Sequence, residues 1–375
     1  MIIGIPKEVK TDEFRVGATP SNVAVLVEES HKVIVQSGAG VGSGFSDKEY
    51  EDAGGEIVDS AELLYSQSKL IVKVKEPQIS EYHLLNESHT LFCYLHLAPL
   101  PELISTLVEK KLCAIAYETV AIDRQLPLLK PMSEIAGKMA PMIGAYHLSR
   151  YQGGEGILMG GAIGVAPANV LIIGAGNAGF AAAKVASGMG ADVSVINRST
   201  PKLELLQNSL ASVKTVVYTP QLFSKLIKDS DIIISSVLIH GGDSTPKLIT
   251  KEILKEMKDG SVLVDITIDQ GGISEGSRPT THTDPVFVEE GVVHYCVANM
   301  PGAYPKTATL ALTNATFEYV RKLANTGTIT AIKNNTALGL GVNVFNGVVC
   351  NSAIAKLHNL EYKELKTLIL EMGEK

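Results

Sequence analysis

The chain has few cysteines and no basic run, and both shortages argue against whole classes of protein. Its four cysteines, at positions 93, 113, 296 and 350, stand far apart and form no C-x-x-C pair. This spacing argues against a disulfide framework or a zinc site and favours free thiols in a reducing compartment. Lys and Arg number 33 against 40 Asp and Glu, for a net charge of −7. We therefore expect no metal and no nucleic-acid partner.

The sequence also lacks a segment typical of export or of a membrane span. Residues 1–8 have no basic start followed by a long apolar region, so they do not resemble a signal peptide. Residues 157–183 carry no charge and are long enough to cross a bilayer. Pro167, Asn169 and six glycines interrupt this tract, however, and a buried strand explains its apolar character better. We therefore expect a soluble, cytoplasmic protein.

Length and pattern predict two α/β domains. At 375 residues the chain exceeds one ordinary hydrophobic core. Strand patterns alternate with helical patterns in the first third and again in the middle third, which predicts two Rossmann-like, doubly wound parallel-sheet domains with a cleft between them. The part from Thr307 onward has a helical pattern, with no further strand. The expected strands cover residues 2–5, 32–36, 70–75, 90–96, 112–117, 170–173, 193–196, 215–218, 232–237, 261–266 and 293–298.

Prolines mark where the chain passes between the two expected domains. Two of them punctuate residues 126–131, and a helix is expected to carry the chain across from there. Two more stand in residues 300–305, where we expect the return passage. The substrate domain is then discontinuous, with residues 1–128 and 306–375, and the dinucleotide-binding domain comprises residues 129–305.

The clearest motif is a G-x-G-x-x-G sequence between a strand at 170–173 and an Ala-rich helix, with a second strand at 193–196. Gly174 would make the tight turn, Gly176 would let the backbone approach a pyrophosphate, and Gly179 would let the helix pack closely on the sheet. The helix N-terminus offers N–H donors to an anion. In this context the motif predicts a dinucleotide site; the alternative is a glycine turn that serves packing alone.

The residue that ends the second strand departs from the usual pattern. An acidic side chain there would bind the ribose 2′-OH of NAD and repel the 2′-phosphate of NADP. Here it is Asn197, followed by Arg198, Ser199 and Thr200. The guanidinium and the two hydroxyls could clamp a phosphate. Alternatively, Asn197 binds the ribose and Arg198 is a solvated surface charge, so the sequence leaves NAD and NADP open.

Four polar residues fall at or beside expected strand ends, where open parallel sheets bind ligands. Lys75 and His96 end two strands, Arg15 lies in the loop after the first strand, and Asp269 follows a strand at 262–268. Their chemistry suits a small 2-amino or 2-oxo acid. Arg15 offers a fork for a carboxylate, Lys75 could polarise a carbonyl, and His96 suits acid/base work. Asp269 could orient a water or an ammonium.

Each of these residues also has a simpler interpretation. Arg15 and Lys75 could be solvated surface charges. Asp269 could be a helix cap and His96 a satisfied core histidine. Four such residues at strand ends or adjacent loops favour function over these alternatives.

Further motifs match a known family in order and spacing. They are residues 3–8 with Arg15-Val16 and Thr19-Pro20, then 132–137, 160–167, 269–281, 297–301 and 305–307. On these motifs the chain resembles the bacterial alanine dehydrogenases along nearly its whole length, and its start resembles the NAD-binding part of proton-translocating transhydrogenase. The resemblance implies reversible oxidative deamination of L-alanine to pyruvate and ammonia, with a nicotinamide dinucleotide and a homohexameric enzyme.

The resemblance also implies roles for individual residues. Arg15 would grip the substrate carboxylate, and Lys75 would contact the carboxylate or the carbonyl. His96 would be the acid/base, and Asp269 would assist at the amine or the attacking water. The family usually carries Asp where this chain has Asn197. The residues expected to contact the dinucleotide are Ser133, Gly174, Ala175, Gly176, Asn177, Ala178, Gly179, Asn197, Arg198, Lys202, Val237, Leu238, Ile266, Asp269, Val297, Asn299 and Met300.

Three alternatives stay open at this point. The NAD-binding component of a transhydrogenase would need no amino-acid acid/base, so His96 and residues 275–281 would be surplus. An opine- or saccharopine-type dehydrogenase would share the Lys and His roles but usually departs from the pattern at 269–281. A non-catalytic dinucleotide-binding protein could lose Lys75 or His96 freely, yet both are present.

Overall fold

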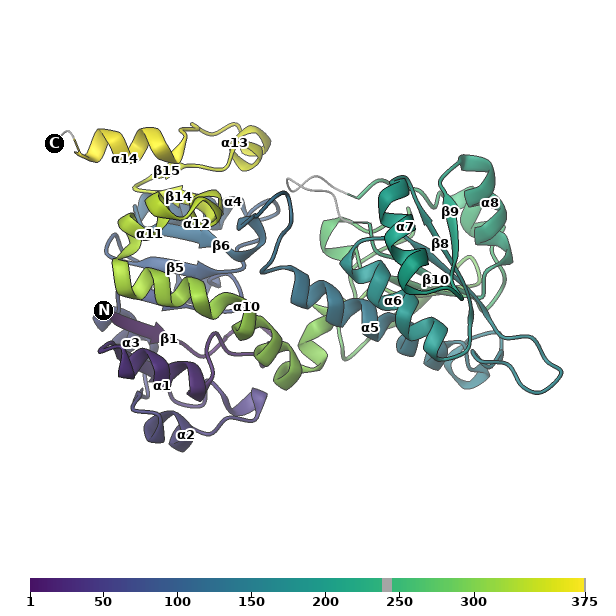
Figure 1. The fold of residues 1–375 in the computed structure, drawn as a ribbon, viewed down its shortest axis with the longest axis horizontal. Helices are drawn as coiled ribbons and strands as arrows, with labels where there is room; N and C mark the ends of the chain where they lie inside the picture. Colours follow the sequence, from purple (N-terminus) through teal and green to yellow (C-terminus); the bar gives the residue numbers. More distant parts are fainter. Residues whose placement is uncertain (238–244, 374–375) are drawn as a thin grey trace. The chain divides into compact units, whose positions relative to one another are not determined.

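The computed structural model describes residues 1–237 and 245–373, which form two compact units. Unit 1 comprises Met1–Pro131 and Tyr304–Lys375, and unit 2 comprises Met132–Ala303. Each unit is a sheet flanked by helices (Figure 1), which confirms the predicted α/β fold class. Within the described residues, no helix combines the length and the apolar character that crossing a membrane requires.

Unit 1 is built around a sheet of eight described strands. The strands are β1 (Ile2–Ile5), β2 (Lys32–Gln36), β3 (Glu56–Val58), β4 (Leu70–Val72), β5 (Thr90–Cys93), β6 (Cys113–Ala116), β14 (Val342–Phe345) and β15 (Val348–Val349). The helices are α1 (Pro20–Glu28), α2 (Asp47–Asp52), α3 (Ala61–Gln67), α4 (Pro101–Glu109), α10 (Pro305–Thr326), α11 (Thr328–Asn334), α12 (Thr336–Gly341), α13 (Ser352–His358) and α14 (Leu365–Gly373). The order is β15-β14-β6-β5-β4-β1-β2-β3, and β1 to β6 pair in parallel. Helix α10 packs beside α1 and against β4 (Figure 1).

Two strands of unit 1 end three residues earlier than predicted. β4 ends at Val72 and β5 at Cys93, before the predicted ends at Lys75 and His96. His96 has a φ of 46°, a left-handed backbone that a strand cannot contain. Lys75 and His96 therefore lie in the loops that follow the strands.

The prediction that no strand follows Thr307 is wrong. β14 pairs antiparallel with β6, with Val342 opposite Ile115, and β15 closes a hairpin on β14. The hairpin turns through Asn346 and Gly347, whose φ angles are 48° and 83°. An Asn-Gly pair is the residue pair that such two-residue turns favour. This Asn-Gly pair was the one feature of the sequence that could have predicted the hairpin. The flanking strands are too short to show the alternation of apolar and polar residues that marks a strand.

Unit 2 contains a Rossmann sheet with one added edge strand. Its strands are β7 (Asn169–Ile173), β8 (Asp192–Asn197), β9 (Lys214–Val217), β10 (Ile232–Ser235), β11 (Val262–Asp265), β12 (Val286–Glu289) and β13 (Val292–Tyr295). The helices of this part of the chain are α5 (Lys130–His147), α6 (Asn177–Gly188), α7 (Thr200–Ser209), α8 (Pro220–Asp229) and α9 (Lys251–Lys255). The strand order is β12-β13-β11-β10-β7-β8-β9. Without β12, which pairs antiparallel with β13, this is the doubly wound order of six parallel strands.

Candidate active site

Unit 1 gathers polar side chains where its parallel strands end. β1, β4, β5 and β6 are neighbours in the sheet, and because they run parallel their carboxyl ends share one edge. Arg15 follows β1, Lys75 follows β4 and His96 follows β5. Glu118 follows β6, in a 3₁₀ turn. Three of the four residues expected to act on the substrate are therefore brought to one edge of one sheet.

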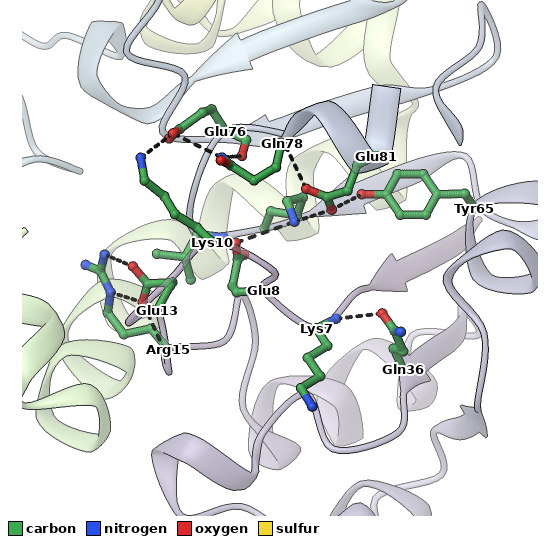
Figure 2. Close-up of polar contacts among 12 residues, drawn as sticks. Lys7, Glu8, Lys10, Glu13, Arg15, Gln36, Tyr65, Glu76, Gln78 and Glu81 are labelled. Atoms are coloured by element: carbon green, nitrogen blue, oxygen red, sulfur yellow. Dashed lines mark hydrogen bonds and ion pairs between the residues drawn. The ribbon is translucent and has the colours of Figure 1, made fainter. Parts of the chain in front are cut away.

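Arg15 is buried and paired, not a solvated surface charge. Its side chain is 2% exposed, and its Nε and Nη2 donate to the two carboxylate oxygens of Glu13 at 2.7 and 2.6 Å (Figure 2). Burial alone would raise the pKa of Glu13, but the hydrogen bonds and charge of Arg15, with the charge of Lys75, lower it to about 2. The two-pronged pairing fixes the plane of the guanidinium, the group expected to bind a carboxylate.

Lys75 is also buried, with 6% of its surface exposed. Its charge contributes to the lowered pKa of Glu13 and opposes the burial that raises the pKa of Glu118, so its ammonium lies near both carboxylates. The backbone before it is held by Val74, whose N–H donates to Glu8 Oε1 at 2.7 Å. The surface-charge interpretation of Lys75 is therefore wrong as well.

His96 lies in an unusual backbone conformation. Its φ of 46° is in the left-handed region, which His tolerates better than most residues other than Gly. The N–H of His96 donates to Glu118 Oε1 at 2.6 Å. Its ring stacks on Tyr94, with centroids 5.8 Å apart and planes inclined by 18°. The Tyr94 hydroxyl in turn donates to the Leu128 carbonyl at 2.6 Å, so unit 1 holds both the backbone and the ring of His96.

A buried ion network that no sequence pattern marks lies beside this edge. Lys73 is 0% exposed, and its Nζ lies 2.7 Å from Glu81 Oε1 and 3.4 Å from Glu8 Oε2. Tyr65 donates its hydroxyl to the same Glu81 oxygen at 3.1 Å (Figure 2). Because Glu8 also binds the backbone one residue before Lys75, the network anchors the segment that leads to that lysine.

In unit 2 the glycine-rich turn follows β7 and opens α6. Gly174 has a φ of 107°. A Cβ on Gly179 would lie 2.0 Å from the Gly174 oxygen, so any larger residue at position 179 would keep the first turn of α6 from packing against the glycine turn. A Cβ on Gly176 would meet no described atom within 4 Å. Open space therefore lies beside the N-terminus of α6, where no side chain caps the helix. These residues fit the pyrophosphate of a dinucleotide.

Two glycines of α6 give a matched test of this turn. Gly179→Ala is expected to weaken dinucleotide binding at least about tenfold and to lower stability by about 1–3 kcal/mol, because its methyl group would lie 2.0 Å from a carbonyl oxygen. At Gly188 a Cβ meets no described atom within 4 Å, so Gly188→Ala should stabilise the chain by about 0.4–1 kcal/mol. Fluorescence titration with the dinucleotide and thermal melting measure both effects; equal affinities for the two variants would contradict the expectation.

Asn197 ends β8, as predicted, and contacts the glycine turn. Its Oδ1 accepts from the N–H of Ala175 at 3.3 Å, and its Nδ2 donates to the carbonyl of Ser199 at 3.1 Å. Arg198 is exposed, with its guanidinium carbon 5.4 Å from the centroid of the Tyr218 ring. The position expected to meet the ribose thus holds a neutral amide whose two polar atoms both bind the backbone around it.

The other residues expected to contact the dinucleotide come from several elements of unit 2. Val237 and Ile266 follow β10 and β11, which are neighbours of β7 on one side, so they lie at the same sheet edge as the glycine turn. Leu238 lies outside the described residues. The others are Ser133 in α5, Asn177 and Ala178 in α6, Lys202 in the first turn of α7, and Val297, Asn299 and Met300 after β13.

Asp269 is exposed, inside a 3₁₀ turn after β11, and is not a helix cap. The loop that carries it is shaped by Asp265, which ends β11 and is 0% exposed. One Asp265 oxygen accepts from the N–H and the hydroxyl of Thr267 at 3.1 and 2.6 Å. The other accepts from the Ile273 N–H and the Ser277 hydroxyl at 2.8 and 2.7 Å. The sequence analysis did not identify Asp265. The feature that could have identified it is its place as an acidic residue at the end of an otherwise apolar strand.

Both units of the chain are similar to known proteins. Residues 4–136 match the family described as "Alanine dehydrogenase/PNT, N-terminal domain", and residues 140–352 match "Alanine dehydrogenase/PNT, C-terminal domain". An alanine dehydrogenase of Staphylococcus saprophyticus is 47% identical over 98% of this chain and 100% of its own length.

Solved structures agree with this result. A structure of an L-alanine dehydrogenase has 43% identity and a TM-score of 0.91, covering 96% of this chain and 99% of its own. A transhydrogenase from Sinorhizobium meliloti is more distant, with 26% identity and a TM-score of 0.79 over 94% of this chain and 100% of its own. The chain therefore belongs to the alanine dehydrogenase/PNT family.

Proposed function

We propose that this chain catalyses the reversible oxidative deamination of L-alanine to pyruvate and ammonia, with a nicotinamide dinucleotide as hydride acceptor. The observation that carries the proposal is the placement of Arg15, Lys75 and His96 at one sheet edge, in a chain whose relatives are named alanine dehydrogenases. Unit 1 then holds the substrate. Unit 2 holds the dinucleotide, with its pyrophosphate at the glycine turn that opens α6.

Each predicted residue has a task in this reaction. Arg15, its plane fixed by Glu13, binds the substrate carboxylate, and Lys75 binds the carboxylate or the carbonyl oxygen. The dinucleotide, when bound, would supply the acceptor for the hydride of Cα. The substrate ammonium releases one proton to solvent, so that loss of the hydride leaves an iminium. His96 accepts a proton from the water that adds to the iminium carbon and returns it to the nitrogen of the carbinolamine. The nitrogen then leaves as ammonia, which takes up the hydroxyl proton as pyruvate forms. Asp269 orients the amine or that water.

The purified chain, supplied with L-alanine and NAD, tests this function. Reduced nucleotide, pyruvate and ammonium are expected to appear in equal amounts. Hydride transfer that depends on a second nucleotide and not on L-alanine would indicate a transhydrogenase component instead. No turnover under either condition would contradict the proposal.

For the cofactor, we propose that NAD is preferred, but with weaker discrimination against NADP than an acidic residue at position 197 would provide. Asn197 keeps a contact to the glycine turn but brings no charge to repel a 2′-phosphate. Asn197→Asp is therefore expected to raise the ratio of kcat/KM with NADH to that with NADPH about tenfold or more.

Initial rates with pyruvate and ammonium, run in parallel with NADH and NADPH, measure this ratio. An unchanged ratio in Asn197→Asp would contradict the role given to position 197. A wild-type chain that uses NADPH as well as or better than NADH would instead make Asn197, Arg198 and Ser199 a phosphate clamp. Arg198→Ala should then raise the KM for NADPH alone.

The assembly and location expected from the family belong to the same proposal. We expect a homohexamer in the cytoplasm, acting on small molecules without a nucleic-acid or membrane partner. Light scattering on the purified chain should give the mass of six copies, and a monomer with full activity would contradict this assembly.

A further inference from the structure

Glu118 is a partly buried glutamate to which the proposed reaction gives no task. It follows β6, and its carboxylate accepts hydrogen bonds from two consecutive backbone N–H groups of the loop that follows β5. Its Oε1 lies 3.1 Å from the Leu95 nitrogen and 2.6 Å from the His96 nitrogen, and its Oε2 lies 3.2 Å from the Leu95 nitrogen. One carboxylate therefore links the loop that carries His96 to the 3₁₀ turn that follows β6.

These bonds act on the unusual backbone of His96. At a φ of 46° the residue is in a conformation that most side chains disfavour. Successive N–H groups that converge on one anion form a concave site, and hydrogen bonds to a carboxylate are stronger than those between neutral groups. Tyr94 stacks on the imidazole ring, whereas Glu118 binds the backbone that carries it. The bonds to Glu118 therefore contribute to the direction of the imidazole.

Glu118 also lies near Lys75. Burial raises the pKa of the Glu118 carboxyl, whereas the backbone N–H groups and the charge of Lys75 favour its ionised form. The carboxylate thus stands close to two residues to which the proposed function gives tasks. Its own oxygens are engaged with the loop backbone.

We propose that Glu118 is a positioning residue for His96: its carboxylate fixes the left-handed backbone of the loop and so directs the imidazole, without itself touching the substrate. The inference rests on the proposed function, in which His96 carries the proton. A misplacement of about 1 Å in a reacting group can cost about 10²-fold in rate. The loss of this carboxylate should therefore act on the chemical step.

A double-mutant cycle between Glu118 and His96, made in the full chain, tests the proposal. Glu118→Gln replaces one oxygen with a donor that cannot accept from the loop, and Glu118→Asp keeps the charge but withdraws both oxygens. Each variant is measured alone and combined with His96→Asn. Glu109→Gln, at an exposed position on α4, is the matched control. Thermal melting checks that each variant folds. If Glu118→Gln does not fold, Glu118→Asp takes its place in the double-mutant cycle.

Glu118→Gln is expected to lower kcat roughly 10- to 10²-fold while changing the KM for L-alanine less than about threefold. The acidic limb of the kcat–pH profile should move to lower pH, because a negative charge near His96 is lost. Added to His96→Asn, the same change should cost less than about twofold, since Glu118 acts through His96.

Wild-type kcat in Glu118→Gln would overturn the proposal, and so would losses that multiply in the double variant. Either result, in a chain whose wild type is active, overturns the role of Glu118 alone. Absence of L-alanine turnover in the wild type would overturn the proposed function as well. The two failures are therefore distinguishable.

Discussion

His96→Asn is expected to lower kcat for the deamination of L-alanine roughly 10²–10⁴-fold. Asn is chosen because it is among the few residues that tolerate a left-handed backbone, here at a φ of 46°. The backbone bond to Glu118 is then kept while the imidazole is removed. An amide cannot carry a proton between water and ammonia, so the loss should fall on kcat in both directions of the reaction.

Steady-state rates with L-alanine and with pyruvate and ammonium measure the effect, and dinucleotide titration checks that cofactor binding persists. His83→Asn is the matched control, because His83 is an exposed histidine of the same unit and should leave kcat unchanged. A His96→Asn enzyme that retains kcat within about threefold of wild type would remove His96 from the chemistry.

Lys73→Met is expected to lower the free energy of unfolding by about 3–5 kcal/mol. Lys73 is 0% exposed and lies between two carboxylates, 2.7 Å from Glu81 and 3.4 Å from Glu8. Removal of the ammonium leaves both acidic groups buried without their cation. The midpoint of urea unfolding, followed by circular dichroism at one protein concentration, measures the loss.

Lys48→Met is the matched control for that experiment. Lys48 pairs with Asp52 at 2.8 Å, but its side chain is 76% exposed, so Lys48→Met should leave the midpoint of urea unfolding nearly unchanged. Equal losses in the two variants would contradict the account of the buried network.

The effect of Lys73→Met should also depend on pH. Burial raises the pKa of Glu8 from 4.5 to about 7, against the attraction of Lys73. The folded state therefore holds a proton that the unfolded state has released, and the contribution of Glu8 to stability is complete below pH 4.5 and is lost as the pH rises through about 7. Without Lys73 the ionised carboxylate is harder to keep buried, so Lys73→Met should be less destabilising at pH 5 than at pH 8.

Local patterns were sufficient for some features of the site. Gly174, Gly176 and Gly179 lie within one short segment, and the need for glycine there is local, because a Cβ on Gly179 would lie 2.0 Å from a backbone oxygen of the same segment. The strand pattern likewise placed Lys75 and His96 at the carboxyl ends of two parallel strands. The strands end three residues earlier, but both residues still follow the strands at the same edge of the sheet. These predictions needed no knowledge of partners distant in the chain.

The acidic partners could not be predicted in the same way. Glu8 reaches Val74, 66 residues away, and Glu118 reaches His96, 22 residues away, so no local pattern marks either contact. The chain holds 40 acidic residues, and nothing near these two separates them from the exposed ones. The pairing of Glu13 with Arg15 could have been predicted, because the two residues are only two positions apart. An acid and a base at that spacing are equally compatible with a solvated loop, however. Burial, which decides between these interpretations, is set by the fold.

The measurement that tests the central claim most directly is the reductive amination of pyruvate by the purified chain with isotopically labelled ammonium and NADH. The account predicts L-alanine carrying the labelled nitrogen, formed in equal amount with the nucleotide oxidised, and loss of that product in His96→Asn. Oxidation of NADH without labelled alanine, or labelled alanine formed equally well by His96→Asn, would contradict it.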